Sequence, residues 1–76
     1  SNLAAGVMIL LNTPFYLGDE IEVKGVRGTV KTITMTYTKL VDEENNKITL
    51  PNSIVWGNPI KNTTTYNTTK KQTPNG

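Results

Sequence analysis

The feature that most constrains this chain is an apolar segment that runs directly into a β-strand pattern. Residues 3–11 read Leu-Ala-Ala-Gly-Val-Met-Ile-Leu-Leu and contain no polar side chain. A helix that is apolar on every side belongs in a deep core or in lipid, and 76 residues build only a modest core. The segment is also shorter than the roughly 20 residues that span a bilayer. It therefore predicts a truncated membrane helix or, as the alternative, an ordinary end-helix docked on the β module.

Beyond this segment, the chain alternates as β-strands do. Pro14 disfavours helical geometry at Thr13, so the helix should stop there. Alternating and β-branched residues then predict short strands over 20–24, 29–35, 36–41, 47–50 and 60–62. The alternation slips between Val30 and Ile33, which predicts a bulge or bend near Lys31. The pattern favours a mainly β fold, a small five-stranded Sm-like or SH3-like barrel preceded by a short N-terminal helix.

Turn residues punctuate the predicted strands. Gly18-Asp19 indicates a turn before the first strand. Gly25 and Gly28 permit positive φ in the connection between the first two strands. The polar run over 42–46 is typical of a solvated hairpin tip. Its three acids are a weak candidate for a cation site, because a calcium loop needs spaced oxygen ligands and usually a glycine.

A helical turn is expected after the fourth strand. Pro51 breaks that strand, and Asn52 tolerates left-handed geometry. Ser53 is the expected N-cap of a single turn over residues 54–56, and Gly57 should end it. Together these boundaries divide the chain into a helix end (1–13), a β domain (14–62) and a disordered polar tail (63–76).

Composition excludes most chemistry. The chain has no cysteine and no histidine, so thiolate sites and imidazole bases are absent. Glu20 and Glu22 share the wet face of one strand, and Ser53 has no histidine partner. The net charge of +2 comes from Lys70 and Lys71, which leaves residues 1–62 neutral. We therefore expect no enzyme, no cofactor and no metal.

A set of short motifs stands out along the chain. They are Asn2-Leu3-Ala4-Ala5-Gly6, Pro14-Phe15, Gly18-Asp19, Gly28-Thr29-Val30, Pro51-Asn52-Ser53 and Ile60-x-Asn62. In this order and at nearly this spacing, they resemble the small-conductance mechanosensitive channel (MscS) family. The resemblance covers residues 1 or 2 through about 62.

The resemblance implies a role for each part of the chain. Residues 2–12 would match the end of the third transmembrane helix, and residues 17–62 would form a cytoplasmic Sm-like β domain. Seven such domains would ring a cytosolic vestibule, in a cell-membrane channel that contacts lipid and opens under membrane tension to relieve osmotic stress. The expected structural or gating residues are Gly6, Pro14, Phe15, Gly18, Asp19, Gly25, Gly28, Pro51 and Asn52. Among them, Gly6 would let the helix flex, and Phe15 would pack where the helix meets the β module.

The chain also departs from this family. Other transmembrane helices and the following α/β domain are missing, and the loop over 42–46 is longer and more acidic than usual. We therefore expect a fragment that conducts no ions and is monomeric alone. The main alternative is a soluble Sm-like or SH3-like nucleic-acid-binding module, disfavoured by the neutral β domain and its scattered aromatic residues. A further alternative is a scaffold domain of a membrane complex with no gating role.

Overall fold

A computed structural model describes residues 1–64 of the chain. Its elements are helix α1 (Asn2–Asn12), strands β1 (Glu20–Val23), β2 (Val26–Ile33), β3 (Tyr37–Val41) and β4 (Lys47–Pro51), helix α2 (Asn52–Trp56) and strand β5 (Ile60–Asn62). The mainly β fold with a short N-terminal helix is confirmed. Most of the predicted polar tail, residues 65–76, lies outside the described residues.

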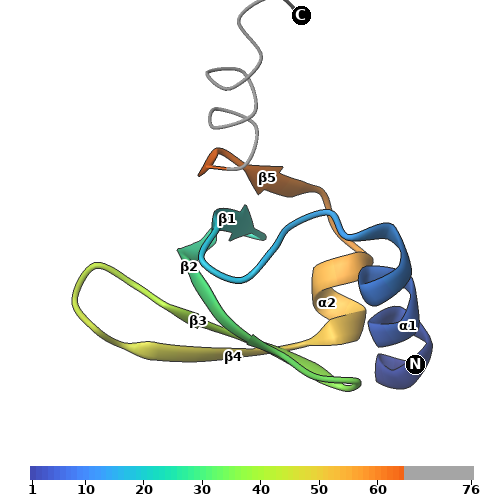
Figure 1. The fold of residues 1–76 in the computed structure, drawn as a ribbon. Coiled ribbons are helices and arrows are strands. Elements are labelled where there is room, and N and C mark those ends of the chain that lie inside the picture. The colour runs from blue at the N-terminus through green and yellow to red at the C-terminus, as the bar shows by residue number, and fades with distance from the viewer. Residues whose placement is uncertain (65–76) are drawn as a thin grey trace, which may run out of the picture.

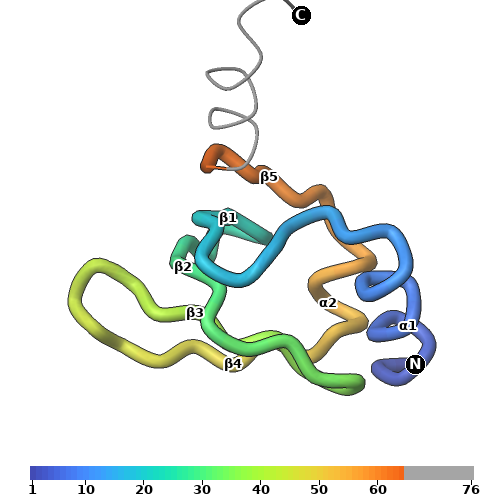
Figure 2. The backbone as a smooth tube through the Cα atoms, viewed as in Figure 1, coloured from blue at the N-terminus to red at the C-terminus, as the bar shows by residue number. Residues whose placement is uncertain are grey.

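The strands form one antiparallel sheet that stays open. Its order is β4-β3-β2-β1-β5. Within residues 1–64 no ladder joins the edge strands β4 and β5, so the predicted closed barrel is not confirmed. The sheet is strongly curved, with α1 and α2 side by side at one end and the β3–β4 hairpin projecting at the other (Figures 1 and 2).

Two local features of the strands follow from the sequence. The register of β2 against β3 shifts between Val30 and Thr32, which confirms the predicted bulge. The β1–β2 hairpin turns through Lys24 (φ 52°) and Gly25 (φ 80°), as a two-residue type I′ turn requires. Gly28 does not share this role, because it lies inside β2. A Cβ on Gly28 would come within 2.9 Å of the Val41 carbonyl oxygen, so glycine is needed there for close strand approach.

The helical turn exists, but two predictions about it were wrong. Helix α2 begins at Asn52. Within residues 1–64 Asn52 does not have a positive φ, so it does not adopt the left-handed geometry considered for it. The N-cap position is Pro51, whose side chain makes no capping hydrogen bond, and Ser53 lies inside the helix. The reason is that Asn52 is completely buried and uses its side chain for tertiary hydrogen bonds. Gly57 ends the helix as expected, with φ −81°.

The core lies between the curved sheet and the two helices. Its buried members are Ile9, Phe15, Ile21, Val23, Val30, Leu40, Leu50 and Val55. Phe15 is the largest of them and is 2% exposed. It follows α1 directly, so the link between helix and sheet is itself part of the core. No helix within residues 1–64 has the length and hydropathy needed to cross a membrane.

The loop that joins β3 to β4 is ordered by one carboxylate. Asp42 accepts hydrogen bonds from the backbone N–H groups of Glu44 (2.9 Å) and Asn46 (2.8 Å), and from Asn46 Nδ2 (3.0 Å). Asn45 adopts the left-handed conformation, with φ 64°, which asparagine tolerates well. The Asn46 side chain is the largest cause of a lowered Asp42 pKa, followed by its backbone N–H.

Replacing Phe15 tests how far the fold depends on the link. We expect Phe15→Ala to cost about 3–5 kcal/mol of unfolding free energy. A core of this size rarely supplies more than about 3–5 kcal/mol in total, so the variant should lose its cooperative urea transition. Tyr16→Ala, which removes a neighbouring side chain that is 55% exposed, is the matched control and should keep the transition. An unfolding midpoint unchanged by Phe15→Ala would contradict this assignment.

The Asp42 loop predicts a defined pH response. Because the pKa of Asp42 is lowered in the folded state, its stabilisation is present above the ordinary pKa and is lost as pH falls through the folded-state value. Asn46→Ala removes the main cause, so NMR titration of the Asp42 carboxyl should show its pKa rising toward the ordinary value. Asn45→Gly keeps both partners and should leave the pKa low. An equal pKa in all three chains would refute the role of Asn46.

Candidate functional site

The candidate site is the junction where α1 meets the sheet. The buried face of α1 consists of Ala5, Gly6 and Ile9. A Cβ built on Gly6 would lie 2.0 Å from the Met35 carbonyl oxygen and 2.8 Å from Asn52 Nδ2. These distances are far below normal contact, so α1 can reach the β2–β3 turn only because residue 6 has no side chain.

Asn52 forms the buried polar centre of this junction. Its Oδ1 accepts a hydrogen bond from Thr38 Oγ1 (2.9 Å), and its Nδ2 donates to the Thr34 carbonyl oxygen (2.9 Å). Its backbone N–H donates to the Thr36 carbonyl oxygen at 3.0 Å. Thr38 is also fully buried. Since a buried amide without partners costs free energy, these bonds fix the β2–β3 turn, β3 and α2 in one arrangement.

A second asparagine ties the start of α1 to the start of α2. Asn2 Oδ1 accepts a hydrogen bond from the Ser53 backbone N–H at 3.0 Å. This N–H lies in the first turn of α2, where helical N–H groups lack intrahelical partners. Pro51, the N-cap residue of α2, makes no capping hydrogen bond. Asn2 of α1 supplies that bond instead. The Ser1 hydroxyl performs the same task for α1 by accepting from the Ala4 N–H at 3.2 Å.

The link between α1 and β1 is a fixed turn. Gly18 has φ 92°, and the Asp19 N–H donates to the Tyr16 carbonyl oxygen at 3.0 Å. In return, the Tyr16 N–H donates to Asp19 Oδ2 at 2.9 Å. The carboxylate therefore closes its own turn, which needs a residue such as glycine at the positive-φ position.

Asn62 at the end of β5 clamps this link. Its Nδ2 donates to the Pro14 carbonyl oxygen (3.1 Å) and to Asp19 Oδ2 (3.0 Å). Asp19 is 8% exposed, and buried polar groups of this kind are normally hydrogen-bonded, as its Oδ2 is here to the Tyr16 N–H and to Asn62. One side chain from the last strand thus holds both ends of the segment that joins α1 to β1.

The predicted site residues fall into three groups. Gly6, Pro51 and Asn52 gather where α1, β4 and α2 meet. Pro14, Phe15, Gly18 and Asp19 form the link, whereas Gly25 and Gly28 lie apart in the β1–β2 hairpin. The structure assigns Gly6 a packing contact inside an unbroken helix, so flexing at this position stays a prediction.

Sequence reasoning assigned no role to three polar partners. Thr38 was not singled out, and Asn2 and Asn62 entered only as parts of motifs. Thr38 lies on the inward-facing side of β3, whose residues alternate between half-buried and buried, as expected for a strand with one face in the core. A threonine at an inward position of a strand is the signal for a buried hydrogen bond, and it needs a partner such as Asn52 that only the tertiary structure reveals.

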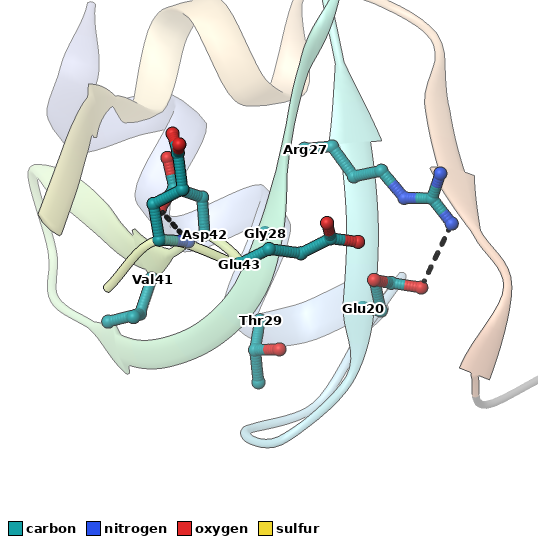
Figure 3. Close-up of a pocket in the computed structure, with 8 residues that line it drawn as sticks. Glu20, Arg27, Gly28, Thr29, Val41, Asp42 and Glu43 are labelled. Carbon is teal, nitrogen blue, oxygen red and sulfur yellow. Dashed lines mark hydrogen bonds and ion pairs between the residues drawn. The ribbon is translucent and has the colours of Figure 1, made fainter. Parts of the chain in front are cut away.

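The acidic loop is separate from this junction. It lines a groove on the outer face of the sheet, together with Glu20 and Arg27 (Figure 3). Within residues 1–64 no set of three potential metal ligands comes together. The Asp42 carboxylate is already used by its own loop.

Exposed apolar side chains concentrate around the junction. Among residues 1–64 the large exposed ones are Leu3, Val7, Met8, Leu10, Leu11, Tyr16, Leu17, Met35 and Trp56. Leu11 is 75% exposed, the largest exposed fraction among them. No charged side chain precedes Asp19. Exposed apolar side chains gathered on neighbouring elements are typical of surfaces that contact lipid or another protein.

Comparison with known proteins agrees with this geometry. Residues 1–65 match the family model described as mechanosensitive ion channel, beta-domain. The small-conductance mechanosensitive channel of Edwardsiella ictaluri is 41% identical over 61 residues, which cover 79% of this chain and 21% of that protein. The small-conductance channel MscMJ of Methanocaldococcus jannaschii is 38% identical over 63 residues, which cover 83% of this chain and 18% of that protein. The chain thus spans about a fifth of these relatives.

Solved structures show the same fold. Helicobacter pylori MscS in its closed state superposes with a TM-score of 0.81 at 30% identity, covering 84% of this chain and 25% of that one. Arabidopsis thaliana MSL1 superposes with a TM-score of 0.77 at 31% identity, covering 80% of this chain and 22% of that one. The two sequence relatives are named as mechanosensitive channels, which are ion channels and not enzymes. The chain belongs to the mechanosensitive ion channel (MscS) family, whose β domain it carries together with the helix that leads into it.

Proposed function

We propose that this domain is the architectural brace of a mechanosensitive channel that opens under membrane tension and relieves osmotic stress. The observation that carries the proposal is the contact of α1 with the sheet at Gly6. There the helix backbone lies directly against the Met35 carbonyl and the Asn52 amide. A force applied to α1 therefore reaches the sheet through backbone and buried polar groups rather than through a flexible linker.

The two asparagine clamps support the same role. Asn2 connects α1 to α2, and Asn62 holds the link to the last strand. Each bond joins residues about fifty positions apart in the sequence, so each closes a long loop of chain. Movement of α1 relative to the sheet would break several of these bonds together, which gives the junction two discrete arrangements rather than a gradual deformation.

The exposed apolar surface indicates where the rest of the channel lies. Leu3, Val7, Leu10 and Leu11 would face lipid or the helices of neighbouring subunits in the cell membrane. The β domain would lie on the cytoplasmic side and form part of the vestibule. By resemblance to its family, the assembly is a homo-oligomer, a heptamer, and there the open sheet takes its place in an Sm-like ring. These 76 residues by themselves are expected to be monomeric, because they span only about a fifth of the channel relatives they match.

A chimeric channel tests this function. Residues 1–64 would replace the matching segment of the Edwardsiella ictaluri channel, to which this chain is 41% identical. We expect the chimera to protect a channel-deficient bacterial host from osmotic downshock and to open under suction in patch-clamp recordings. The unmodified Edwardsiella ictaluri channel is the positive control. A chimera that assembles in the membrane but stays closed up to the lytic tension would contradict the proposal.

A single methyl group at Gly6 tests the brace. Gly6→Ala in the chimera places a Cβ 2.0 Å from the Met35 carbonyl oxygen, so α1 must move away from the β2–β3 turn. We expect a lower opening tension, because α1 is then held less firmly in its closed position.

The neighbouring residue supplies the control for this change. Ala4 is exposed on the same helix, and Ala4→Gly costs about 1 kcal/mol of helix propensity without touching the sheet. We expect its threshold to match that of the parent chimera. A threshold that shifts with Ala4→Gly but not with Gly6→Ala would favour helix flexibility over bracing.

A further inference from the structure

Strand β5 is attached to the domain differently from every other element. Within residues 1–64 the buried apolar core contains at least one side chain from α1, from the link, from α2 and from each of the strands β1 to β4. β5 contributes only Ile60, which is half-buried and packs against that core. Segments with few buried apolar contacts open at a lower free energy than the core does. Strand β5 can therefore leave the sheet while the core stays closed.

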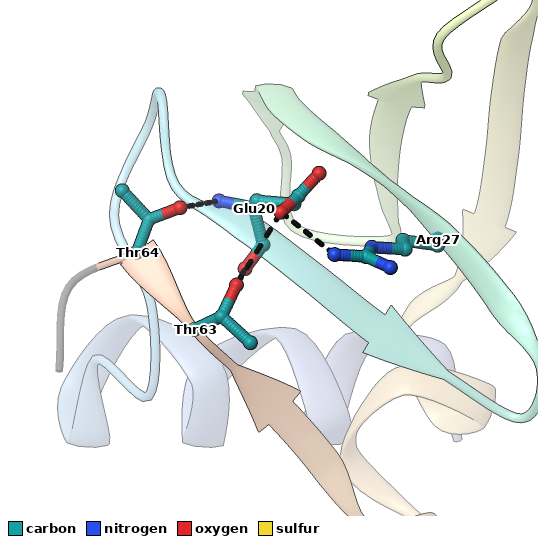
Figure 4. A network of polar contacts seen from close by, with 4 residues as sticks. All are labelled: Glu20, Arg27, Thr63 and Thr64. Atoms are coloured by element: carbon teal, nitrogen blue, oxygen red, sulfur yellow. Dashed lines mark hydrogen bonds and ion pairs between the residues drawn. The ribbon is translucent and has the colours of Figure 1, made fainter. Parts of the chain in front are cut away.

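Backbone hydrogen bonds hold β5 on β1. The strand Ile60–Asn62 pairs with residues 21–23 of β1, which is its one neighbour in the sheet. The pairing continues past the strand, because the Thr63 N–H donates to the Glu20 carbonyl oxygen (3.2 Å) and the Glu20 N–H donates to Thr64 Oγ1 (3.0 Å) (Figure 4). A pull on the chain beyond Thr64 therefore reaches these bonds before it reaches the core.

The two ends of the link between α1 and β1 are held by different strands. At the Asp19 end, β2 makes two backbone bonds, because the Gly18 N–H donates to the Val30 carbonyl oxygen and the Val30 N–H donates to the Asp19 carbonyl oxygen, both at 2.8 Å. At the other end, Asn62 Nδ2 of β5 donates to the Pro14 carbonyl oxygen at 3.1 Å. Loss of β5 would therefore leave the Asp19 end attached and remove the hydrogen bond from the end that adjoins α1.

We propose that β5 is a releasable latch that fixes the direction in which α1 enters the sheet. While β5 is docked, Asn62 holds the backbone at Pro14. When β5 leaves β1, Phe15 stays buried in the core, but the backbone beside it loses this bond, so the C-terminal end of α1 gains freedom to turn. Asn62 is thus a positioning residue that acts on α1 through Pro14. The inference concerns the domain itself and does not rest on the channel role, although in a channel the latch would couple a pull on the chain after β5 to α1.

A reversible disulfide between β5 and β1 tests the latch in the full 76-residue chain. Glu22 and Lys61 lie directly opposite each other, neither is buried, and the chain has no cysteine. Opposite residues of antiparallel strands have Cβ atoms about 4.5–5.5 Å apart, so Glu22→Cys/Lys61→Cys needs only a small adjustment to form a disulfide. We expect the Tyr16 amide hydrogen to exchange about tenfold more slowly in the oxidised form than in the reduced form, because the disulfide keeps β5 docked.

Reference amides separate the latch from a general gain in stability. The Gly18 amide is bonded to β2, so its exchange should not follow the release of β5. We therefore expect the disulfide to slow exchange at Tyr16 relative to Gly18. The matched variant Lys39→Cys/Thr49→Cys joins β3 to β4 and should leave the ratio of the two rates unchanged. An oxidised β1–β5 disulfide that also leaves this ratio unchanged would overturn the proposal.

The variant Asn62→Asp tests the positioning role by its pH dependence. It places a second carboxyl group beside Asp19 Oδ2, to which Asn62 Nδ2 donates at 3.0 Å. Two neighbouring carboxylates repel each other, so one of them keeps its proton to higher pH. We expect the urea midpoint of the variant to lie below that of the parent chain at about pH 7 and to approach it at about pH 4, where a protonated carboxyl group can donate again.

A matched variant controls for the added charge. Asn45→Asp makes the same chemical change in the exposed β3–β4 loop, and its difference from the parent chain should change little with pH. An Asn62→Asp variant whose midpoint lies equally far below that of the parent chain at both pH values would contradict a donor role for Asn62. So would a variant that matches the parent chain at both.

Discussion

The structure depends on one close approach between backbones, that of α1 at Gly6 to the carbonyl of Met35. A side chain at residue 6 would separate the helix from the β2–β3 turn. That separation would pull α1 away from Asn52, whose amide holds the same turn to α2. The core residue Ile9 lies one helical turn further along the buried face of α1. Apolar burial and buried polar bonding therefore both require glycine at this position.

Polar groups specify this arrangement more than they stabilise it. A neutral hydrogen bond contributes only about 0.5–1.5 kcal/mol net, whereas a buried group left without a partner costs about 1–3 kcal/mol. Asn52 is fully buried, so an alternative packing of α1 or of the turn would carry the larger cost. No buried side-chain nitrogen or oxygen within residues 1–64 lacks a hydrogen bond. The domain thus has a small core but one clearly preferred position for its helix.

The sequence predicted the parts of the fold that depend on local pattern. Alternation located the strands, the slip between Val30 and Ile33 located the bulge, and Pro14 located the end of α1. The sequence did not predict the features that depend on a hydrogen bond between one side chain and an element far away in the chain. Asn52 reads as a turn residue, because its neighbours Pro51 and Ser53 favour a turn, yet its conformation is set by Thr38 and Thr34. The cap of α2 comes from Asn2, which lies 51 residues away in the sequence. The open edges of the sheet depend on pairing partners, which local pattern does not encode.

The two sides of the domain differ in chemistry, and this difference bears on how a channel could use it. Large exposed apolar side chains within residues 1–64 occur on α1, its link, the β2–β3 turn and α2. The outer face of the sheet carries the acidic groove instead. Apolar contacts scale with buried area and are not weakened by ionic screening, whereas charge interactions at the exposed groove are. In the proposed channel, membrane force would enter through the apolar side, while ionic conditions would act on the side where the chain departs.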